Sequence, residues 1–182
     1  MTPPRARRTD PGRRDRIVDA CLDVIATSGV AGTSHRAVAA AADVPLGSMT
    51  YHFAGMGELL REAFTRFATA QSDGFEAAMA AASNRDEARA AVVGLVTGDG
   101  GHRDLVLTHE LYTLAARDPA FRDLTTAWMA RSRRALERHF DPVTTRMLDA
   151  LVEGLAMHRA LDTDPDHAAD ATEAVRRITG WP

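Results

Sequence analysis

Residues 32–53 read GTSHRAVAAAADVPLGSMTYHF, and this stretch decides the fold. Thr33 is a good N-cap for a short helix from Ser34 to about Ala41. Asp43 follows at the point where the chain must reverse, and Asp tolerates left-handed backbone better than most residues do. Pro45 suits the first turn of a second short helix. Two short helices joined by a tight turn are typical of a helix-turn-helix.

The second short helix is expected to enter the major groove of DNA. Its surface must be small or polar near its start, so that the backbone can approach the duplex. The first side chain is suited to contact a thymine methyl group, and the next ones offer hydroxyls for bases or phosphates. The phenol and the imidazole near the end of the helix can reach phosphates. The candidates are Leu46, Gly47, Ser48, Thr50, Tyr51 and His52. Met49 and Phe53 are the expected inward anchors.

Apolar spacing predicts helices on both sides of this stretch. The preceding helix runs from about Arg13 to Ser28, and Gly29 ends it. The following helices are expected at about 56–82, 85–96, 101–117, 119–140, 142–161 and 165–179. Three of them begin at an Asp-Pro pair (118–119, 141–142 and 164–165), which combines an N-cap with a first-turn proline. No alternating strand pattern is present, so the fold class is all-α.

Composition narrows the classes of protein further. Hydrophobic residues make up 45 % of the 182 residues, which is enough for a core. No apolar run approaches the length of a membrane span, and no secretory signal is evident, so a cytoplasmic location is expected. The single cysteine, Cys21, excludes an intramolecular disulfide and lies on the apolar stripe of the first helix.

Charge is concentrated at the N-terminus. Residues 1–12 hold three prolines and a glycine, so they are expected to form a flexible arm. Six arginines and two aspartates fall within the first sixteen residues, a balance that suits an anionic polymer such as DNA. A solvated tail without a partner is the alternative. All 22 basic residues are arginine, so arginine abundance as such is weak evidence for nucleic-acid binding.

Residues 14–67 resemble the TetR family of transcriptional regulators. The resemblance rests on Gly29, on residues 32–39, on residues 47–53 and on Glu58-Leu59-Leu60. It implies a homodimer, a three-helix helix-turn-helix domain at residues 13–54 and a helical effector-binding and dimerisation domain at residues 55–182. The positions that match the family's DNA contacts are Thr33, Ser34, Arg36, Ser48, Thr50, Tyr51 and His52; a cap or a solvated surface residue is the alternative for each.

Three positions depart from the family pattern. Asp43 stands where glycine is usual, and Pro45 replaces a common capping serine or threonine. Met56 occupies the place of a lysine that often contacts phosphate. Loss of one such contact is expected to lower the salt dependence of DNA binding by about 0.9 in the logarithmic slope.

The second domain has to be interpreted from its residue patterns alone. Two helices at about 142–179 carry apolar and small residues suited to a four-helix dimer interface, with an ordinary intramolecular core as the alternative. Aromatic walls with a few polar groups suit a small-molecule pocket. The candidate pocket residues are Phe75, Met79, His102, His109, Tyr112, Trp128 and Met129. Core packing explains each of them equally well.

No cofactor or metal site is predicted. His102 and His109 share a helix face, but no spacing supplies a third ligand. The predicted function is a ligand-responsive repressor that a small apolar or aromatic effector releases from a palindromic double-stranded DNA operator. An effector-independent DNA-binding protein is the alternative. An enzyme is disfavoured because no nucleophile elbow, catalytic triad spacing or cofactor loop is present.

Overall fold

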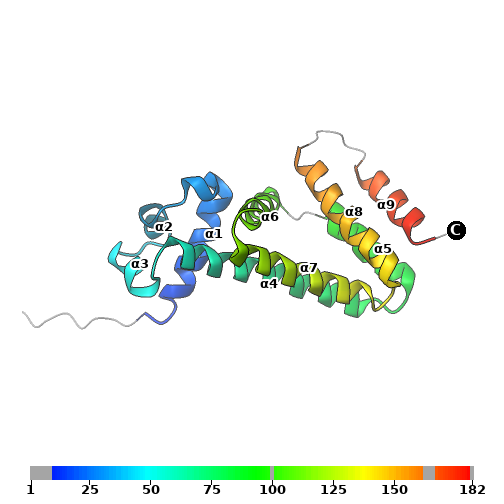
Figure 1. Ribbon diagram of the computed structural model, residues 1–182, viewed down its shortest axis with the longest axis horizontal. Coiled ribbons are helices and arrows are strands. Elements are labelled where there is room, and N and C mark those ends of the chain that lie inside the picture. The colour runs from blue at the N-terminus through cyan, green and yellow to red at the C-terminus, as the bar shows by residue number, and fades with distance from the viewer. Residues whose placement is uncertain (1–9, 99–100, 162–166, 181–182) are drawn as a thin grey trace, which may run out of the picture. The chain divides into compact units, whose positions relative to one another are not determined.

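The computed structural model describes residues 10–98, 101–161 and 167–180, and within these ranges the chain forms nine α-helices and no strand (Figure 1). The predicted all-α class is therefore confirmed. The helices are α1 (Arg13–Gly32), α2 (His35–Ala41), α3 (Gly47–His52), α4 (Met56–Ala81), α5 (Arg85–Thr97), α6 (His102–Ala115), α7 (Pro119–Leu136), α8 (Pro142–Leu161) and α9 (His167–Ile178).

The chain divides into two compact units, Met1–Ala63 and Phe64–Pro182. The division falls inside α4, whereas the sequence placed the domain boundary between residues 54 and 55. A helix that continues through the division carries core residues for each unit, and a boundary of that kind leaves no glycine or proline signal in the sequence.

The first unit is built on the buried stripe of α1. Its fully buried side chains include Ile17, Cys21 and Ile25, which confirms the predicted stripe. Val38 from α2 and Met49 from α3 are also fully buried. Gly29, with a φ of 67°, breaks the helix after Ser28 as predicted, and a short helical segment then continues α1 to Gly32.

The sequence suggested Thr33 as the N-cap of α2, but the N-cap in the structure is Ser34. The Ser34 hydroxyl accepts the backbone N–H of Ala37 at 3.2 Å, because Ser34 has the extended backbone that a capping residue needs. Thr33 instead donates its hydroxyl to the Gly29 carbonyl at 2.8 Å and closes α1.

The turn between α2 and α3 also ends later than expected. Asp43 has the left-handed backbone that was predicted, with a φ of 52°. Pro45 lies outside α3, which begins at Gly47, and the Pro45 carbonyl accepts the N–H of Ser48 at 2.8 Å. The proline therefore precedes the helix and supplies an acceptor to it, instead of occupying its first turn.

Arg14 ties three elements of the first unit together. Its guanidinium pairs with the carboxylate of Glu62 on α4 and lies 4.9 Å from the centre of the Phe53 ring, directly after α3. Such a cation–π contact adds to the ion pair because the ring face is electron-rich. Arg14 thus fixes the start of α1 against the segment that follows α3.

The second unit has a core built from α4, α5, α7, α8 and α9. Its cluster of buried residues includes Phe75, Met79, Val92, Leu136, Phe140, Leu148 and Val175. Figure 1 shows α5, α8 and α9 side by side, in agreement with their mutual contacts. Asp118 caps α7 by accepting the N–H of Ala120 at 2.9 Å, and Asp141 caps α8 by accepting that of Val143 at 2.9 Å. Two Asp-Pro boundaries are thus confirmed, and the third lies outside the described residues.

Two helices are shorter than the sequence indicates. α7 ends at Leu136 and not at Phe140, and α6 ends at Ala115 and not at Arg117. The turn after α7 brings the Phe140 ring into the buried cluster. It is held by a 2.8 Å contact between the His139 Nε2 and the Met79 carbonyl and by a 2.9 Å hydrogen bond from Arg85 to the His139 carbonyl. These long-range contacts override a helical pattern that continues to Phe140 in the sequence.

The left-handed Asp43 gives a test of the helix-turn-helix turn. We expect Asp43→Ala to lower the free energy of unfolding by about 1 kcal/mol, because a Cβ without a local hydrogen-bonding group is strained at positive φ. Asp43→Gly is the matched control and is expected to stay within about 0.5 kcal/mol of the original chain. Denaturant unfolding followed by circular dichroism measures both, and equal losses in the two variants would contradict the explanation.

Candidate functional site

The outer face of α3 carries side chains that a folded domain normally shields. Tyr51 is 83 % exposed and Leu46 is 50 % exposed. Gly47 and Thr50 are also exposed, and an added Cβ at Gly47 would meet no atom within 4 Å. The Tyr51 and His52 rings meet edge to face with centroids 4.9 Å apart, so the exposed phenol has one neighbour that orients it. This face is free to approach another molecule.

The remaining DNA-contact candidates are placed differently from one another. Ser48 is only 8 % exposed and lies with Met49 on the inward side of α3, so its hydroxyl is not presented on the outer face. Ser34 and Arg36 are exposed at the start of α2, although the Ser34 hydroxyl is engaged as the N-cap. Thr33 is half-buried and bonded to α1.

The N-terminal arginines are partly neutralised. Arg16 pairs with Asp10 at 2.7 Å, Arg13 lies 3.8 Å from the same carboxylate, and Arg14 pairs with Glu62. The Arg16 guanidinium is also the main cause of a lowered pKa of Asp10. The other three arginines of the predicted basic arm, at positions 5, 7 and 8, lie outside the described residues, as does most of that arm.

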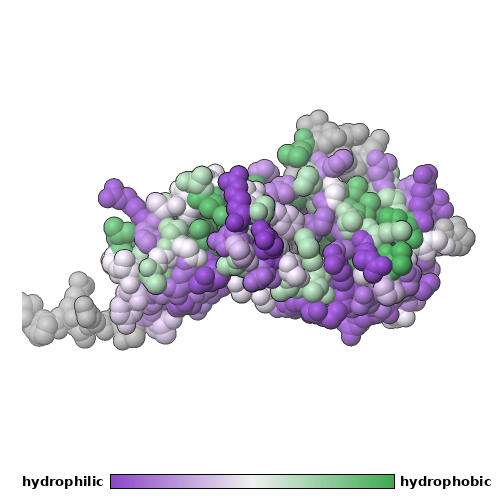
Figure 2. Space-filling model, in the orientation of Figure 1, coloured by the Kyte–Doolittle hydropathy of each residue, from purple (hydrophilic) through white to green (hydrophobic). Residues whose placement is uncertain are grey.

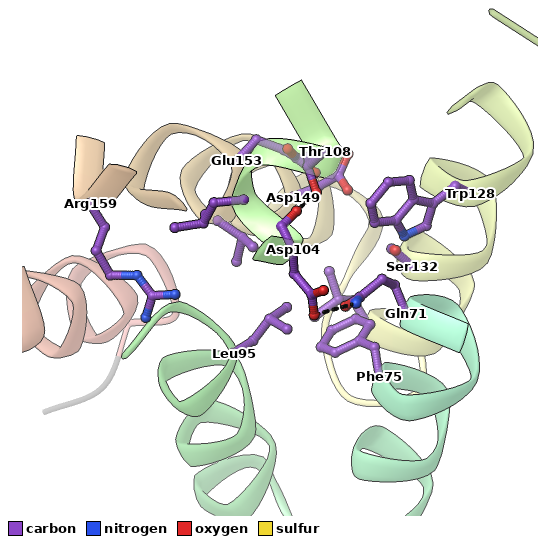
Figure 3. Close-up of a pocket in the computed structure, with 13 residues that line it drawn as sticks. Gln71, Phe75, Leu95, Asp104, Thr108, Trp128, Ser132, Asp149, Glu153 and Arg159 are labelled. Atoms are coloured by element: carbon purple, nitrogen blue, oxygen red, sulfur yellow. Dashed lines mark hydrogen bonds between the residues drawn. The ribbon is translucent and has the colours of Figure 1, made fainter. Parts of the chain in front are cut away.

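The second unit contains a cavity of about 140 Å³ between helices α4 to α8 (Figure 3). Its apolar wall includes Phe75, Leu95, Trp128, Leu136 and Val152. Its polar lining includes Gln71, Asp104, Thr108, Ser132, Asp149, Glu153 and Arg159. Aromatic and aliphatic walls with a few polar groups are what small-molecule sites are made of.

Most of the charged groups at this cavity have partners on the protein. Asp104 accepts a hydrogen bond from Gln71 at 3.0 Å, which Figure 3 shows across the cavity, and also pairs with Arg103 at 3.4 Å. Asp149 pairs with Arg133 at 2.7 Å. Arg159 donates to the Gly98 carbonyl at 2.6 Å.

Glu153 is the exception among the carboxylates of the lining. Burial is the largest cause of its raised pKa, the Asp149 carboxylate adds to it, and hydrogen bonding to Tyr112 opposes it. Burial, and then Glu153, raise the pKa of Tyr112. The Tyr112 hydroxyl is buried without a hydrogen bond of good geometry to the described residues, so its attraction to Glu153 is a weak one.

An apolar stripe runs along the exposed side of α8. It consists of Val143, Met147, Ala150, Gly154, Met157 and Leu161, and all six are exposed. They are spaced by four and three residues in turn, which places them on one helix face. Leu151, four residues after Met147, lies off this stripe and packs against the core. Figure 2 shows hydrophobic residues at the surface over α5, α8 and α9, between hydrophilic ones.

Two family models match most of the chain. The model described as "Bacterial regulatory proteins, tetR family" matches residues 17–63, and the model described as "Tetracyclin repressor-like, C-terminal domain" matches residues 83–180. The chain belongs to the TetR family. It is a TetR-family transcriptional regulator, and the first match covers the helix-turn-helix while the second covers the helices after α4 together with most of the cavity lining.

Solved structures of similar chains agree with this assignment. SCO7518 of Streptomyces coelicolor A3(2), a predicted transcriptional regulator, is 57 % identical, with a TM-score of 0.84, and the match covers 93 % of this chain and 99 % of that one. The multidrug-binding protein EbrR in complex with ethidium is 36 % identical, with a TM-score of 0.76 and the same two coverages. EbrR with proflavin is 35 % identical, with a TM-score of 0.69, covering 91 % and 99 %. No curated protein matches the chain.

The structure brings two of the seven predicted pocket residues of this TetR-family chain to the cavity, Phe75 and Trp128. Met79 is fully buried in the core cluster, and Tyr112 lies behind Trp128 with ring centroids 6.1 Å apart. His102 is exposed and His109 and Met129 are half-buried, and none of the three lines the cavity. Sequence reasoning missed Gln71, Asp104, Asp149, Glu153 and Arg159. The one signal that these residues leave in the sequence is their position, because each is a polar residue beside core positions of an amphipathic helix.

Two further searches cover only the described part of the chain. None of its helices has the length and apolar character that crossing a membrane requires. Among the same residues, no group of three or more His, Cys, Asp or Glu side chains is arranged to hold a metal ion.

The raised pKa of Glu153 predicts a pH-dependent effect of its replacement. A carboxyl whose pKa is higher in the folded state contributes stability below its unfolded pKa, and that contribution is lost as pH rises through the folded pKa. The amide side chain in a Glu153→Gln variant does not titrate. We therefore expect this variant to gain stability over the original chain as pH rises above the ordinary glutamate range, in thermal unfolding measured at several pH values. A constant difference at all pH values would contradict the burial of the charge.

Proposed function

We propose that this TetR-family regulator is a repressor that binds a two-fold symmetric operator as a homodimer and leaves it when a small aromatic molecule occupies the cavity. The observation that carries the proposal is the course of α4. This helix begins four residues after α3 ends, and its later turns bear Gln71 and Phe75, which line the cavity. One continuous helix therefore carries part of the proposed ligand site and directly follows the proposed DNA-reading helix in the chain.

The outer face of α3 supports the DNA-binding part of the proposal. Leu46 offers an apolar contact for a thymine methyl, and Thr50 and Tyr51 offer hydroxyls for bases or phosphates. Gly47 leaves open space, so the helix can approach the groove closely. Arg36 is exposed at the start of α2 and is suited to a phosphate.

The cavity supports an effector. EbrR, at about one third identity, is a multidrug-binding protein crystallised with ethidium, proflavin and malachite green. The cavity described above is close in size to an engineered cavity of about 150 Å³ that binds benzene. A ligand of two or more fused rings would require the walls to move outward, which gives ligand binding a means to displace α4. A fully packed second unit would have favoured an effector-independent DNA-binding protein.

The apolar stripe of α8 supports the homodimer. Each of its residues is exposed in the single chain, and Leu161 is 77 % exposed. Ala150 and Gly154 at the middle of the stripe are small enough to let a second copy of α8 approach closely. With α9 packed beside α8, two such pairs would form a four-helix interface within residues 142–179. A dimer of this kind presents two α3 helices to two half-sites.

The first experiment is a DNA-binding titration with the purified full chain. The probe is the intergenic DNA upstream of its own coding region, at two salt concentrations and with unrelated competitor DNA. Tight and competitor-resistant binding, reversed by an aromatic ligand such as ethidium added below the concentration at which it alters free DNA, supports the proposal. Binding that any competitor abolishes equally would count against it.

The outer face of α3 can be tested by substitution. We expect Thr50→Ala combined with Tyr51→Ala to weaken operator binding by about tenfold to a thousandfold, since each base or phosphate contact contributes on the order of 1–3 kcal/mol. Fluorescence anisotropy with labelled operator measures the loss. Both side chains are exposed, so the unfolding temperature should be unchanged.

A matched control for this variant is Thr27→Ala on α1. Thr27 is exposed and bonds only within its own helix, to the Asp23 carbonyl at 2.9 Å. It is expected to bind the operator like the original chain. If the double variant also does so, α3 is not the reading helix.

The apolar stripe of α8 gives a test of the homodimer. Met147→Glu places a charge at the centre of the proposed interface, and because Met147 is 52 % exposed the single chain should still fold. We expect sedimentation to show a monomer and operator binding to fall by at least about a hundredfold, since the two half-sites are then bound separately. Ala127→Glu on the exposed side of α7 is the control and should leave the dimer intact. A dimeric Met147→Glu variant would place the interface elsewhere.

A further inference from the structure

The charge distribution inside the cavity leaves one carboxyl group unmatched. Asp149 has Arg133, and Asp104 has Gln71 and Arg103. No cationic side chain within the described residues affects Glu153; its causes of perturbation are burial, Asp149 and Tyr112 alone. Glu153 is half-buried, and without a cation its charged form is disfavoured, so the carboxyl favours its protonated form or recruits a positive charge.

The surroundings of Glu153 favour the second outcome when a ligand enters. Trp128 and Phe75 line the same cavity, and the faces of aromatic rings attract cations. The lining holds three acidic side chains against a single arginine, Arg159, whose guanidinium already donates to the Gly98 carbonyl. Figure 3 shows Arg159 and Trp128 on opposite sides of the cavity, so a ligand charge beside the tryptophan avoids the arginine. An anionic ligand would face like charges and is disfavoured.

We propose that the effector of this regulator is a cation whose charge is spread over an aromatic frame, and that Glu153 binds this charge and releases its own proton when the ligand enters. The inference rests on the proposed function only in that the effector occupies this cavity. The carboxyl O–H bond breaks, the proton passes to solvent, and the carboxylate that remains forms the ion pair with the ligand.

Tyr112, Asp104 and Asp149 are the other titratable groups near Glu153. Tyr112 on α6 has its pKa raised, so it stays neutral throughout the range in which proteins of this kind are studied. Asp104 on α6 and Asp149 on α8 are paired as described, and the lining residues of α4 and α5 (Gln71, Phe75 and Leu95) do not titrate. Loss of proton release in a Glu153→Gln variant would therefore assign the released proton to Glu153.

A pair of probes that differ only in charge tests the inference. N-methylquinolinium is a permanent cation, and 1-methylnaphthalene has the same two fused rings and methyl group without the charge. Titration calorimetry with the full chain at about pH 6, in two buffers of different ionisation enthalpy, measures affinity and proton release together. We expect the cation to bind at least about tenfold more tightly than the neutral probe and to release protons, whereas the neutral probe should release none.

Affinity for the cation should also depend on pH. Because the carboxyl must ionise, binding is expected to strengthen as pH rises above the ordinary glutamate range and to level off once the carboxyl is ionised in the free protein. The neutral probe should show no such trend. Equal affinity for the two probes, no proton release with the cation, or no measurable binding of either probe at millimolar concentration would each overturn the inference.

Glu153→Gln removes the charge and keeps the shape of the side chain. We expect the affinity for the cation to fall at least about tenfold, with loss of proton release, and the affinity for the neutral probe to stay within about twofold. Glu137→Gln, an exposed change of the same charge at the end of α7, is the control and should behave like the original chain. A Glu153→Gln variant that keeps full affinity for the cation would overturn the assignment, and the comparison of the two probes on the unaltered chain does not depend on how this variant folds.

These titrations contain no DNA, so their outcome is separate from that of the operator experiment. A chain that binds its operator but shows no preference for the cation remains a regulator with a different effector. A chain that prefers the cation but does not bind specific DNA retains the ligand site and loses the proposed role as a repressor.

Discussion

The two units depend on one uninterrupted helix, α4. Its buried side chains serve the first unit at Leu59 and Ala63 and the second at Phe64, Phe67 and Met79. Buried residues follow one face of α4 at three- and four-residue spacing, from Leu60 through Phe64, Ala68, Ser72 and Phe75 to Met79, so the stripe continues through the division between the units. A polar residue or a proline within this stretch would remove core contacts from both units at once. The same helix carries the cavity residues Gln71 and Phe75 and directly follows α3 in the chain.

Ion pairs and a hydrogen bond also hold α4 against its neighbours in the second unit. Arg131 of α7 pairs with Glu76 at 2.7 Å and with Asp73 at 2.6 Å, and Gln71 is bonded to Asp104 of α6. The Arg131 guanidinium is the main cause of the lowered pKa of Glu76. These partly exposed contacts contribute little to stability individually, but they fix the register of α4 against α6 and α7. Within the second unit, the register of α4 is therefore tied to the helices that line the cavity.

Sequence reasoning succeeded where local chemistry decides the structure. Asp118 and Asp141 cap their helices, Asp43 has left-handed backbone, and the stripe of Ile17, Cys21 and Ile25 is buried, because each depends on residues only a few positions away. It was wrong where distant contacts decide. The end of α7 is set by the burial of Phe140, and the choice of Ser34 over Thr33 as N-cap is set by how α1 finishes. The cavity residues Glu153 and Asp104 could not be found in this way, since a carboxyl group one position from a core residue appears in the sequence as an ordinary solvated charge.

The side chains that depart from the usual burial pattern, apolar ones at the surface and an acid that is withdrawn from it, are more informative about this molecule than its core is. The apolar stripe of α8 and Tyr51 lie at the surface of the single chain. Polar residues could therefore replace them at no cost to its fold. Keeping Leu161, Met147 and Tyr51 exposed is unfavourable for the isolated chain, and the loss is offset only when a partner covers them. The carboxyl group of Glu153 is the inverse case, a half-buried acid without a pairing cation among the described residues. We propose a different occupant for each of the three features: a second copy of the chain at α8, a nucleic acid at α3, and a ligand that carries a positive charge into the cavity.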